Sequence, residues 1–129
     1  MKIFQIKFGR LLARADFEFH DDDIFIRRIP PNRRNSSGRP TRGAFQGRDS
    51  ETSVYLKRIL RGRQVPTRNR GDDLAEFSVK WLFDISLTKT PLKVVKDRGA
   101  HFIIKGRLSI EFKDFLRDNS VIIRSIDLD

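Results

Sequence analysis

Hydrophobic side chains are concentrated in two flanks of the chain, and a long polar stretch separates them. Ten of the eleven Phe lie outside residues 27–70, and only Phe45 lies inside. Apolar and polar residues alternate over residues 2–8, which is typical of a β-strand. Residues 24–29 predict a second strand, which Pro30 and the proline after it end because proline has no backbone donor.

The middle of the chain is polar and its structure is only partly predictable. Residues 32–47 are mainly Arg, Asn, Ser, Gly, Pro and Thr without a core-forming face, so they predict a long loop. The residues that follow, up to about residue 60, are compatible with either a helix or a strand. Ser50 suits the N-cap of a short helix that ends near Leu60, whereas the strand-prone residues at 52–55 favour a strand. A second polar loop is expected over residues 61–73.

Residues 74–87 fit two periodicities at once. Every second residue from Phe77 to Leu87 is apolar, as in a strand, while apolar residues also recur at helical spacing from Leu74 onwards. Because Asp72 and Asp73 suit the positive N-terminal end of a helix, we expect a helix in the first half of this segment.

The last third of the chain gives the clearest pattern. Residues 91–95 and 101–104 predict two strands around a turn at Asp97-Arg98-Gly99. Apolar residues at helical spacing from Leu108 predict a helix that ends near Asn119. Residues 121–123 then predict a closing strand.

These elements predict the fold class and the domain organisation. Domains commonly have about 100–150 residues, and the chain has 129. We therefore expect one small α+β domain over residues 1–129, with a mixed or antiparallel sheet and one or two helices. A long Arg-rich loop insertion at residues 30–73 completes the prediction.

Charge changes this picture, because nearly all of it lies in the insertion. From Arg27 to Arg70 the chain carries twelve Arg and one Lys against two acidic residues, a net charge of +11, whereas the remaining residues sum to −1. Such segregated charge is typical of a surface that meets a polyanion. The partner that we expect is therefore nucleic acid, RNA or DNA.

The choice of Arg over Lys supports the same partner. Inside this stretch Arg outnumbers Lys by twelve to one, and outside it the count is six to eight. Arg offers a planar fork to phosphate oxygens or to guanine, and the neighbouring Gly residues let the backbone approach closely. The candidate nucleic-acid-binding residues are Arg27, Arg28, Arg33, Arg34, Arg39, Arg42, Arg48, Arg58, Arg61, Arg63, Arg68 and Arg70.

Ser37-Gly38-Arg39-Pro40 resembles part of the AT-hook, whose Arg-Gly-Arg-Pro core lies in the minor groove of A·T-rich DNA. Ser37 stands where that motif has its first Arg, so one of the two groove-inserting side chains is missing. An Arg/Gly/Ser-rich segment that folds onto RNA fits equally well. The near absence of aromatic residues in the stretch favours contact with phosphates over the stacking of bases.

A nuclease is the main alternative to a simple binding protein. The cluster His20 with Asp21, Asp22 and Asp23 could hold Mg²⁺ for phosphodiester hydrolysis, with His20 as a base. His101, with an Arg such as Arg98 or Arg107, could instead act without a metal. A solvated turn and a partly buried structural His are the simpler readings of these residues, so no catalytic or metal-binding residue is assigned.

The chain has no Cys, which excludes disulfides and thiolate metal sites. It shows no secretory signal and no apolar run long enough to span a membrane, so we expect a cytoplasmic protein without a cofactor. Our first hypothesis is a non-enzymatic nucleic-acid-binding subunit of a larger nucleoprotein assembly. The alternatives are a small toxin-like or defence nuclease and an adaptor whose Arg-rich loop binds an acidic protein.

Overall fold

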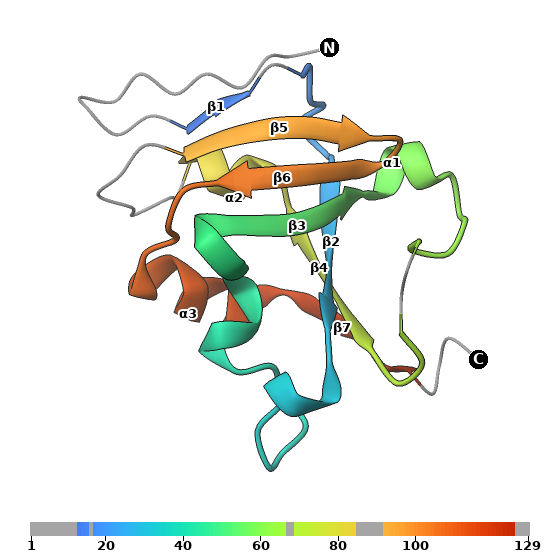
Figure 1. The fold of residues 1–129 in the computed structure, drawn as a ribbon, viewed down its shortest axis with the longest axis vertical. Coiled ribbons are helices and arrows are strands. Elements are labelled where there is room, and N and C mark those ends of the chain that lie inside the picture. The colour runs from blue at the N-terminus through green and yellow to red at the C-terminus, as the bar shows by residue number, and fades with distance from the viewer. Residues whose placement is uncertain (1–12, 16, 67–68, 85–91, 126–129) are drawn as a thin grey trace.

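The computed structural model describes residues 13–15, 17–66, 69–84 and 92–125, and it shows a twisted sheet with short helices packed mainly on one side (Figure 1). The predicted strand at residues 2–8 lies outside the described residues. The strands are β1 (Ala13–Ala15), β2 (Ile24–Ile29), β3 (Glu51–Leu56), β4 (Asp73–Ser78), β5 (Leu92–Arg98), β6 (His101–Lys105) and β7 (Val121–Ile123). The helices are α1 (Lys57–Leu60), α2 (Lys80–Asp84) and α3 (Ile110–Asn119), and three short 3-10 turns are η1 (Pro31–Arg33), η2 (Arg42–Phe45) and η3 (Arg48–Ser50).

Within the described ranges the strands form one sheet in the order β1-β5-β6-β3-β2-β4-β7. β1 pairs parallel with β5, and each other neighbouring pair is antiparallel. The predicted α+β fold with a mixed or antiparallel sheet is therefore confirmed. The strands expected at residues 24–29, 91–95, 101–104 and 121–123 are also confirmed.

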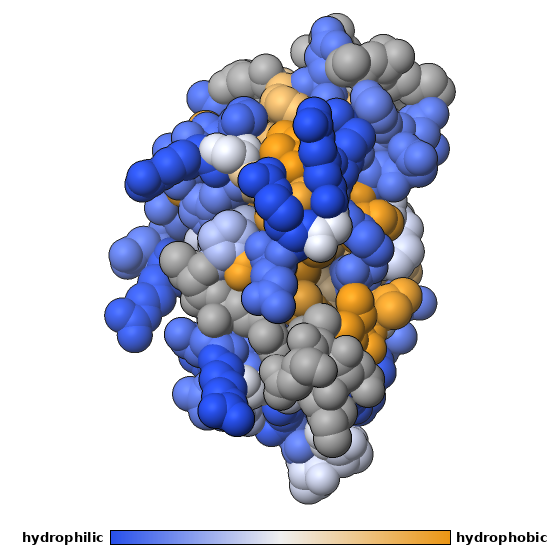
Figure 2. Space-filling model, turned by 90° about the vertical axis from the view of Figure 1, so that its right-hand side faces the viewer, coloured by the Kyte–Doolittle hydropathy of each residue, from blue (hydrophilic) through white to orange (hydrophobic). Residues whose placement is uncertain are grey.

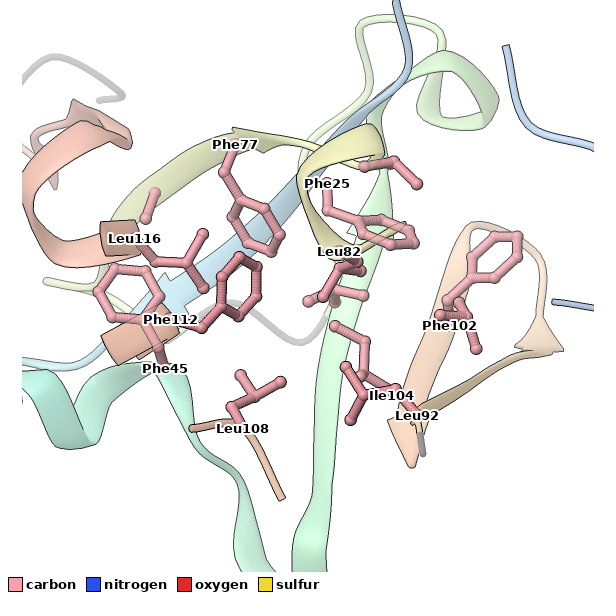
Figure 3. Close-up of a cluster of buried hydrophobic side chains, with 14 of the residues drawn as sticks. Phe25, Phe45, Phe77, Leu82, Leu92, Phe102, Ile104, Leu108, Phe112 and Leu116 are labelled. Atoms are coloured by element: carbon pink, nitrogen blue, oxygen red, sulfur yellow. The ribbon is translucent and has the colours of Figure 1, made fainter. Parts of the chain in front are cut away.

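The main core lies between one face of the sheet and the covering segments α2, α3 and η2 (Figure 3). Phe25 and Phe77 are opposite each other on β2 and β4, and Phe112 and Leu116 reach them from α3. The predicted helix near residues 108–119 is confirmed as α3. It begins where the Ser109 hydroxyl accepts a hydrogen bond from the Phe112 amide at 3.1 Å, which satisfies a free N-terminal donor.

The other face of the sheet carries a smaller apolar cluster, covered in part by α1 and the loop after it. Ile26 and Leu74 of the sheet pack there with Leu60 and Val65. Figure 2 shows the side of the molecule that bears α1, where apolar surface lies between strongly hydrophilic side chains. These residues and Ile123 line a mainly apolar hollow of about 230 Å³.

Two expectations for the middle of the chain need correction. The first half of residues 74–87 is strand β4, because Leu74, Ala75 and Phe77 pack on both faces of the sheet, and helix α2 follows it. Asp72 and Asp73 do not begin a helix. They are buried and pair with arginines instead.

The segment 30–73 is not loop throughout. It contains β3, which pairs with both β2 and β6 near the middle of the sheet, and the open choice at residues 50–60 resolves into β3 followed by α1. The expectation of no core-forming face in residues 32–47 is wrong, because Ala44 and Phe45 in η2 are buried in the main core. η2 packs against α3, so this part of the loop lies on the body of the protein.

Candidate nucleic-acid interface

The candidate site lies where strands β2 and β3 separate. β2 pairs with β3 only at Phe25–Leu56 and Ile26–Tyr55, whereas it pairs with β4 over its whole length. Figure 1 shows β2 turning away from β3 after this short contact. The separation leaves β3 backbone groups without a strand partner on that side, and such groups need other donors.

Arg27 supplies these donors. Its Nε donates to the Ala44 carbonyl at 3.0 Å, and its Nη1 donates to the Ser53 carbonyl at 2.8 Å. Arg27 lies on the same face of β2 as Phe25 and Ile29, which are both fully buried. The guanidinium therefore closes the gap between the diverging strands and η2, and it is held in one orientation.

Three further arginines lie around the same gap. A hollow of about 520 Å³ is lined by Arg27, Arg28, Arg33 and Arg48, together with Asp49, Glu51, Ser53 and residues of the 43–47 loop. We call it the arginine hollow. Arg28 lies 3.9 Å from the Asp72 carboxylate, whereas the side chains of Arg33 and Arg48 make no hydrogen bond or ion pair with any residue that the structure describes.

The environment of Arg27 is unfavourable for its positive charge. Burial, together with repulsion from Arg28 and Arg33, lowers the pKa of Arg27 to about 10. No carboxylate contributes to this shift. Arg27 is still a cation at neutral pH, and its charge is less favourable there than in water.

Other predicted arginines are instead neutralised by carboxylates. Arg58 makes a two-pronged contact with buried Asp23, at 2.8 and 3.0 Å, and this hydrogen bonding raises the pKa of Arg58. Arg34 Nε lies 3.1 Å from Asp73, and its Nη2 donates to the Ile29 carbonyl at 3.0 Å. These side chains hold the fold together.

Arg42 belongs to the same group, although it lies on the surface. It binds both oxygens of Asp114 on α3, at 2.6 and 3.0 Å, which raises the pKa of Arg42 and lowers that of Asp114. The pair joins η2, one wall of the arginine hollow, to α3.

The AT-hook resemblance implies that the Arg39 side chain is available to enter a minor groove, but in the structure it contacts α3. Its Nη2 donates to the Arg117 carbonyl at 2.9 Å, near the C-terminal end of α3. The Asn35 side chain accepts hydrogen bonds from the Ser37 and Arg39 amides, both at 3.0 Å, and closes the segment into a tight turn with Gly38 at φ 82°. The turn directs Arg39 back onto the domain.

The remaining candidates lie away from the arginine hollow. Arg63 donates to the Leu60 carbonyl at 2.9 Å. Arg61 and Arg70 are exposed, and neither side chain has a polar partner among the described residues. Arg68 lies outside the described residues.

The acidic cluster has a structural partner. Ligand atoms of His20, Asp22 and Asp23 lie within 4.8 Å of one another, which is a spacing that could hold a metal ion. Both Asp23 oxygens, however, accept hydrogen bonds from Arg58, and one also accepts from the His20 amide at 2.8 Å. The best-placed carboxylate is therefore already occupied by a cation.

His101 also has a structural environment. Its Nδ1 lies 2.7 Å from an Asp97 oxygen across the β5–β6 turn, and its ring centroid lies 5.1 Å from that of Tyr55. These contacts orient the ring on the sheet. Arg98 is the register partner of His101 where β5 and β6 pair, so the two residues are neighbours on the sheet.

Arg124 is a structurally important residue that the sequence reasoning missed, and Asp73, which was expected at a helix N-terminus, has a different role. Buried Asp73 binds Arg34, Arg124 Nη1 at 3.0 Å and the Ser125 amide at 2.7 Å, so it joins the basic segment to the end of the described chain. Nothing in the local sequence marks Asp73, because its partners are distant in the chain.

Comparisons of the chain with protein-family models, with curated proteins and with solved structures found no match. In the part of the chain that the structure describes, no helix combines the length and the apolar character needed to cross a membrane. The function is therefore inferred from the geometry and charge of the side chains above.

Proposed function

We propose that the protein is a non-enzymatic nucleic-acid-binding subunit that contacts phosphate groups through the arginine hollow. The observation that carries the proposal is the convergence of Arg27, Arg28, Arg33 and Arg48 on one concavity, where Arg33 and Arg48 have no polar partner in the described chain. Gathering like charges is unfavourable unless an anion occupies the site. Phosphate oxygens are the acceptors that guanidinium forks match best.

The proposal narrows the interface from the whole basic segment to one place on it. Arg34, Arg42 and Arg58 are engaged with carboxylates, so they contribute less to the surface potential than their number suggests. Val121 on the edge strand β7 is 64% exposed and offers an apolar contact for another subunit. We propose a cytoplasmic nucleoprotein assembly as the setting.

The test is binding of single-stranded and duplex RNA and DNA over a salt series, measured by fluorescence anisotropy. The variant Arg33→Gln/Arg48→Gln removes two charges from the arginine hollow, and Arg61→Gln/Arg70→Gln removes two charges elsewhere. We expect the first variant to bind at least about tenfold more weakly, because hydrogen bonds to charged groups contribute about 1.5–3 kcal/mol each. Its slope of log K against log salt should be shallower by roughly two phosphates at about 0.7–0.9 each.

The control variant should keep most of the affinity, since neither of its two arginines lines the arginine hollow. Equal losses in the two variants would show that net charge alone drives binding, and absence of binding would refute the proposal. Intact nucleic acid after incubation with Mg²⁺ would separate a binding protein from a nuclease. A complex that survives nuclease treatment would point instead to an acidic protein partner.

A further inference from the structure

Residues of three segments line the arginine hollow. η2 and the residues after it form one wall, the end of β2 with Pro30 and Arg33 forms the second, and Glu51, Ser53 and Ile103 on β3 and β6 form the third. A phosphodiester inside a strand continues on both sides of the phosphate, so two continuations would have to leave the concavity past these segments. A phosphate at the end of a strand has a single continuation.

The charge of the arginine hollow also suits the phosphate group at the end of a nucleic-acid strand. Its lining includes four guanidiniums and the carboxylates of Asp49 and Glu51, a net charge of +2, and Arg28 also lies 3.9 Å from the Asp72 carboxylate outside the lining. A phosphomonoester carries about −1.5 to −2 at neutral pH, because its second pKa is about 6. A phosphodiester carries only one negative charge, and it offers two unesterified oxygens to the guanidiniums where a phosphomonoester offers three.

Arg27 is prepared for such a ligand. An arginine has five N–H donors, and the two bonds from Nε and Nη1 to backbone carbonyls leave Nη2 without a polar partner among the described residues. The side chain is already fixed, so binding an anion costs little further ordering. A doubly charged ligand would also offset the burial and repulsion that lower the pKa of Arg27.

The two carboxylates restrict what lies next to the phosphate. Asp49 and Glu51 make no side-chain hydrogen bond or ion pair with the rest of the described chain, although arginines line the same hollow. Ionised carboxylates only accept hydrogen bonds, so they suit the hydroxyls of a sugar and repel a second phosphate. This pattern favours a single terminal phosphate over a polyphosphate.

We infer that the arginine hollow receives the terminal phosphomonoester of a nucleic-acid strand, held by Arg27, Arg28, Arg33 and Arg48. The inference rests on the proposed function and adds the chemical group that is recognised. Internal phosphodiesters are then bound more weakly, by the cationic surface outside the hollow. The protein thereby distinguishes a phosphorylated strand end from a hydroxyl end.

The experiment compares one short oligonucleotide in three forms, with a 5′-phosphate, with a 3′-phosphate and with hydroxyls at both ends. Each competes for the full-length protein against an internally labelled probe. We expect one phosphorylated form to bind at least about tenfold more tightly than the hydroxyl form, in keeping with a charge-assisted, multidentate contact. Arg33→Gln/Arg48→Gln should lose this preference, and Arg61→Gln/Arg70→Gln should keep it.

A pH series supplies a second readout. The preference should shrink as the pH falls from about 7.5 to about 5, because the phosphate loses its second charge near pH 6. The charged groups that line the hollow are Arg27, Arg28, Arg33, Arg48, Asp49 and Glu51, Asp72 lies behind Arg28 at 3.9 Å, and neither histidine is among the lining residues. The hydroxyl form at each pH corrects for changes elsewhere in the protein.

Three outcomes would overturn the inference. Equal affinity for the three forms, with binding still lost in Arg33→Gln/Arg48→Gln, would refute end recognition and leave the proposed function intact. Displacement of the probe by a nucleoside monophosphate as effectively as by the oligonucleotide would refute a strand as the ligand. Absence of binding to every form would refute the inference and the proposed function together; circular dichroism would confirm that each variant is folded.

Discussion

The basic segment contains two groups of arginines that differ in their partners. Arg34, Arg42 and Arg58 each bind a carboxylate, and Arg34 and Arg58 bind carboxylates that are almost fully buried. Arg33 and Arg48, in contrast, line the arginine hollow without a polar partner in the described chain. The two groups are indistinguishable by composition, so a count of positive charges overstates the surface that a ligand meets.

The arginines that are paired with carboxylates stabilise the fold, whereas those that line the arginine hollow belong to the proposed binding site. The paired arginines join loops to the sheet and to α3, and in doing so they hold the walls of the arginine hollow in place. The arginines of the hollow oppose folding through mutual repulsion, and an anion removes that opposition. Changes in the first group should therefore act on stability, and changes in the second should act on binding.

The largest expected effect on stability is that of Asp73→Asn. The Asp73 side chain is 2% exposed and binds two arginines and the Ser125 amide, so neutralising it removes the carboxylate partner of Arg34 and Arg124 and disrupts a buried hydrogen-bond network. We expect the free energy of unfolding, measured in urea, to fall by about 3–5 kcal/mol. Asp118→Asn is the matched control, because Asp118 pairs with Arg117 at an exposed position.

A fall in Asp73→Asn no larger than that in Asp118→Asn would contradict the scaffold role. The folded fraction of Asp73→Asn should still prefer the same nucleic acid as the wild type. A changed preference in that fraction would show that the two groups of arginines do not act separately.

Gly47→Ala tests whether the shape of the arginine hollow matters apart from its charge. A Cβ at position 47 would lie 1.9 Å from the Glu51 carbonyl oxygen, so the backbone of the wall must shift although every arginine remains. We expect about 1–3 kcal/mol of lost stability and a clear loss of affinity for nucleic acid. The measurements are urea unfolding and anisotropy.

Gly62→Ala provides a control for general destabilisation. Gly62 has φ 80°, which disfavours Ala, but a Cβ there meets no atom within 4 Å and the residue does not line the arginine hollow. We expect a modest stability loss, on the order of 1 kcal/mol, with unchanged affinity. If Gly47→Ala also binds like the wild type, charge alone is sufficient and the shape argument fails.

Much of the fold was predictable because its signals are local. The Pro30-Pro31 end of β2, the turn between β5 and β6, and the helical spacing with the Ser109 cap of α3 each depend on a few neighbouring residues. The first half of residues 74–87 was predicted wrongly as helix because both periodicities are present. Pairing of β4 with β2 and β7 decided between them, and those partners are distant in the chain.

The site was predictable only in outline. The positive charge of the segment was evident, but which arginines find carboxylates depends on Asp23, Asp73 and Asp114, which the fold brings from outside the loop. One local signal was available and was not used. Arg27 shares the alternation phase of buried Phe25 and Ile29, and a charged residue in the apolar phase of a strand indicates a special role.

The smallest expected effect is that of Arg42→Gln, because the pair with Asp114 lies on the surface. Arg42 lowers the pKa of Asp114, chiefly through their hydrogen bonds, so the native state binds fewer protons at this carboxyl than the unfolded state. The stabilisation is therefore present above the ordinary pKa of Asp and is lost as the pH falls through the lowered value. We expect a small decrease in thermal midpoint at neutral pH, which disappears in strong acid and decreases in high salt.

Arg61→Gln, which has no carboxylate partner among the described residues, should show neither dependence. If the difference between wild type and Arg42→Gln were independent of pH, η2 would be held to α3 by its buried residues Ala44 and Phe45 alone, and the wall of the arginine hollow would not depend on a paired arginine.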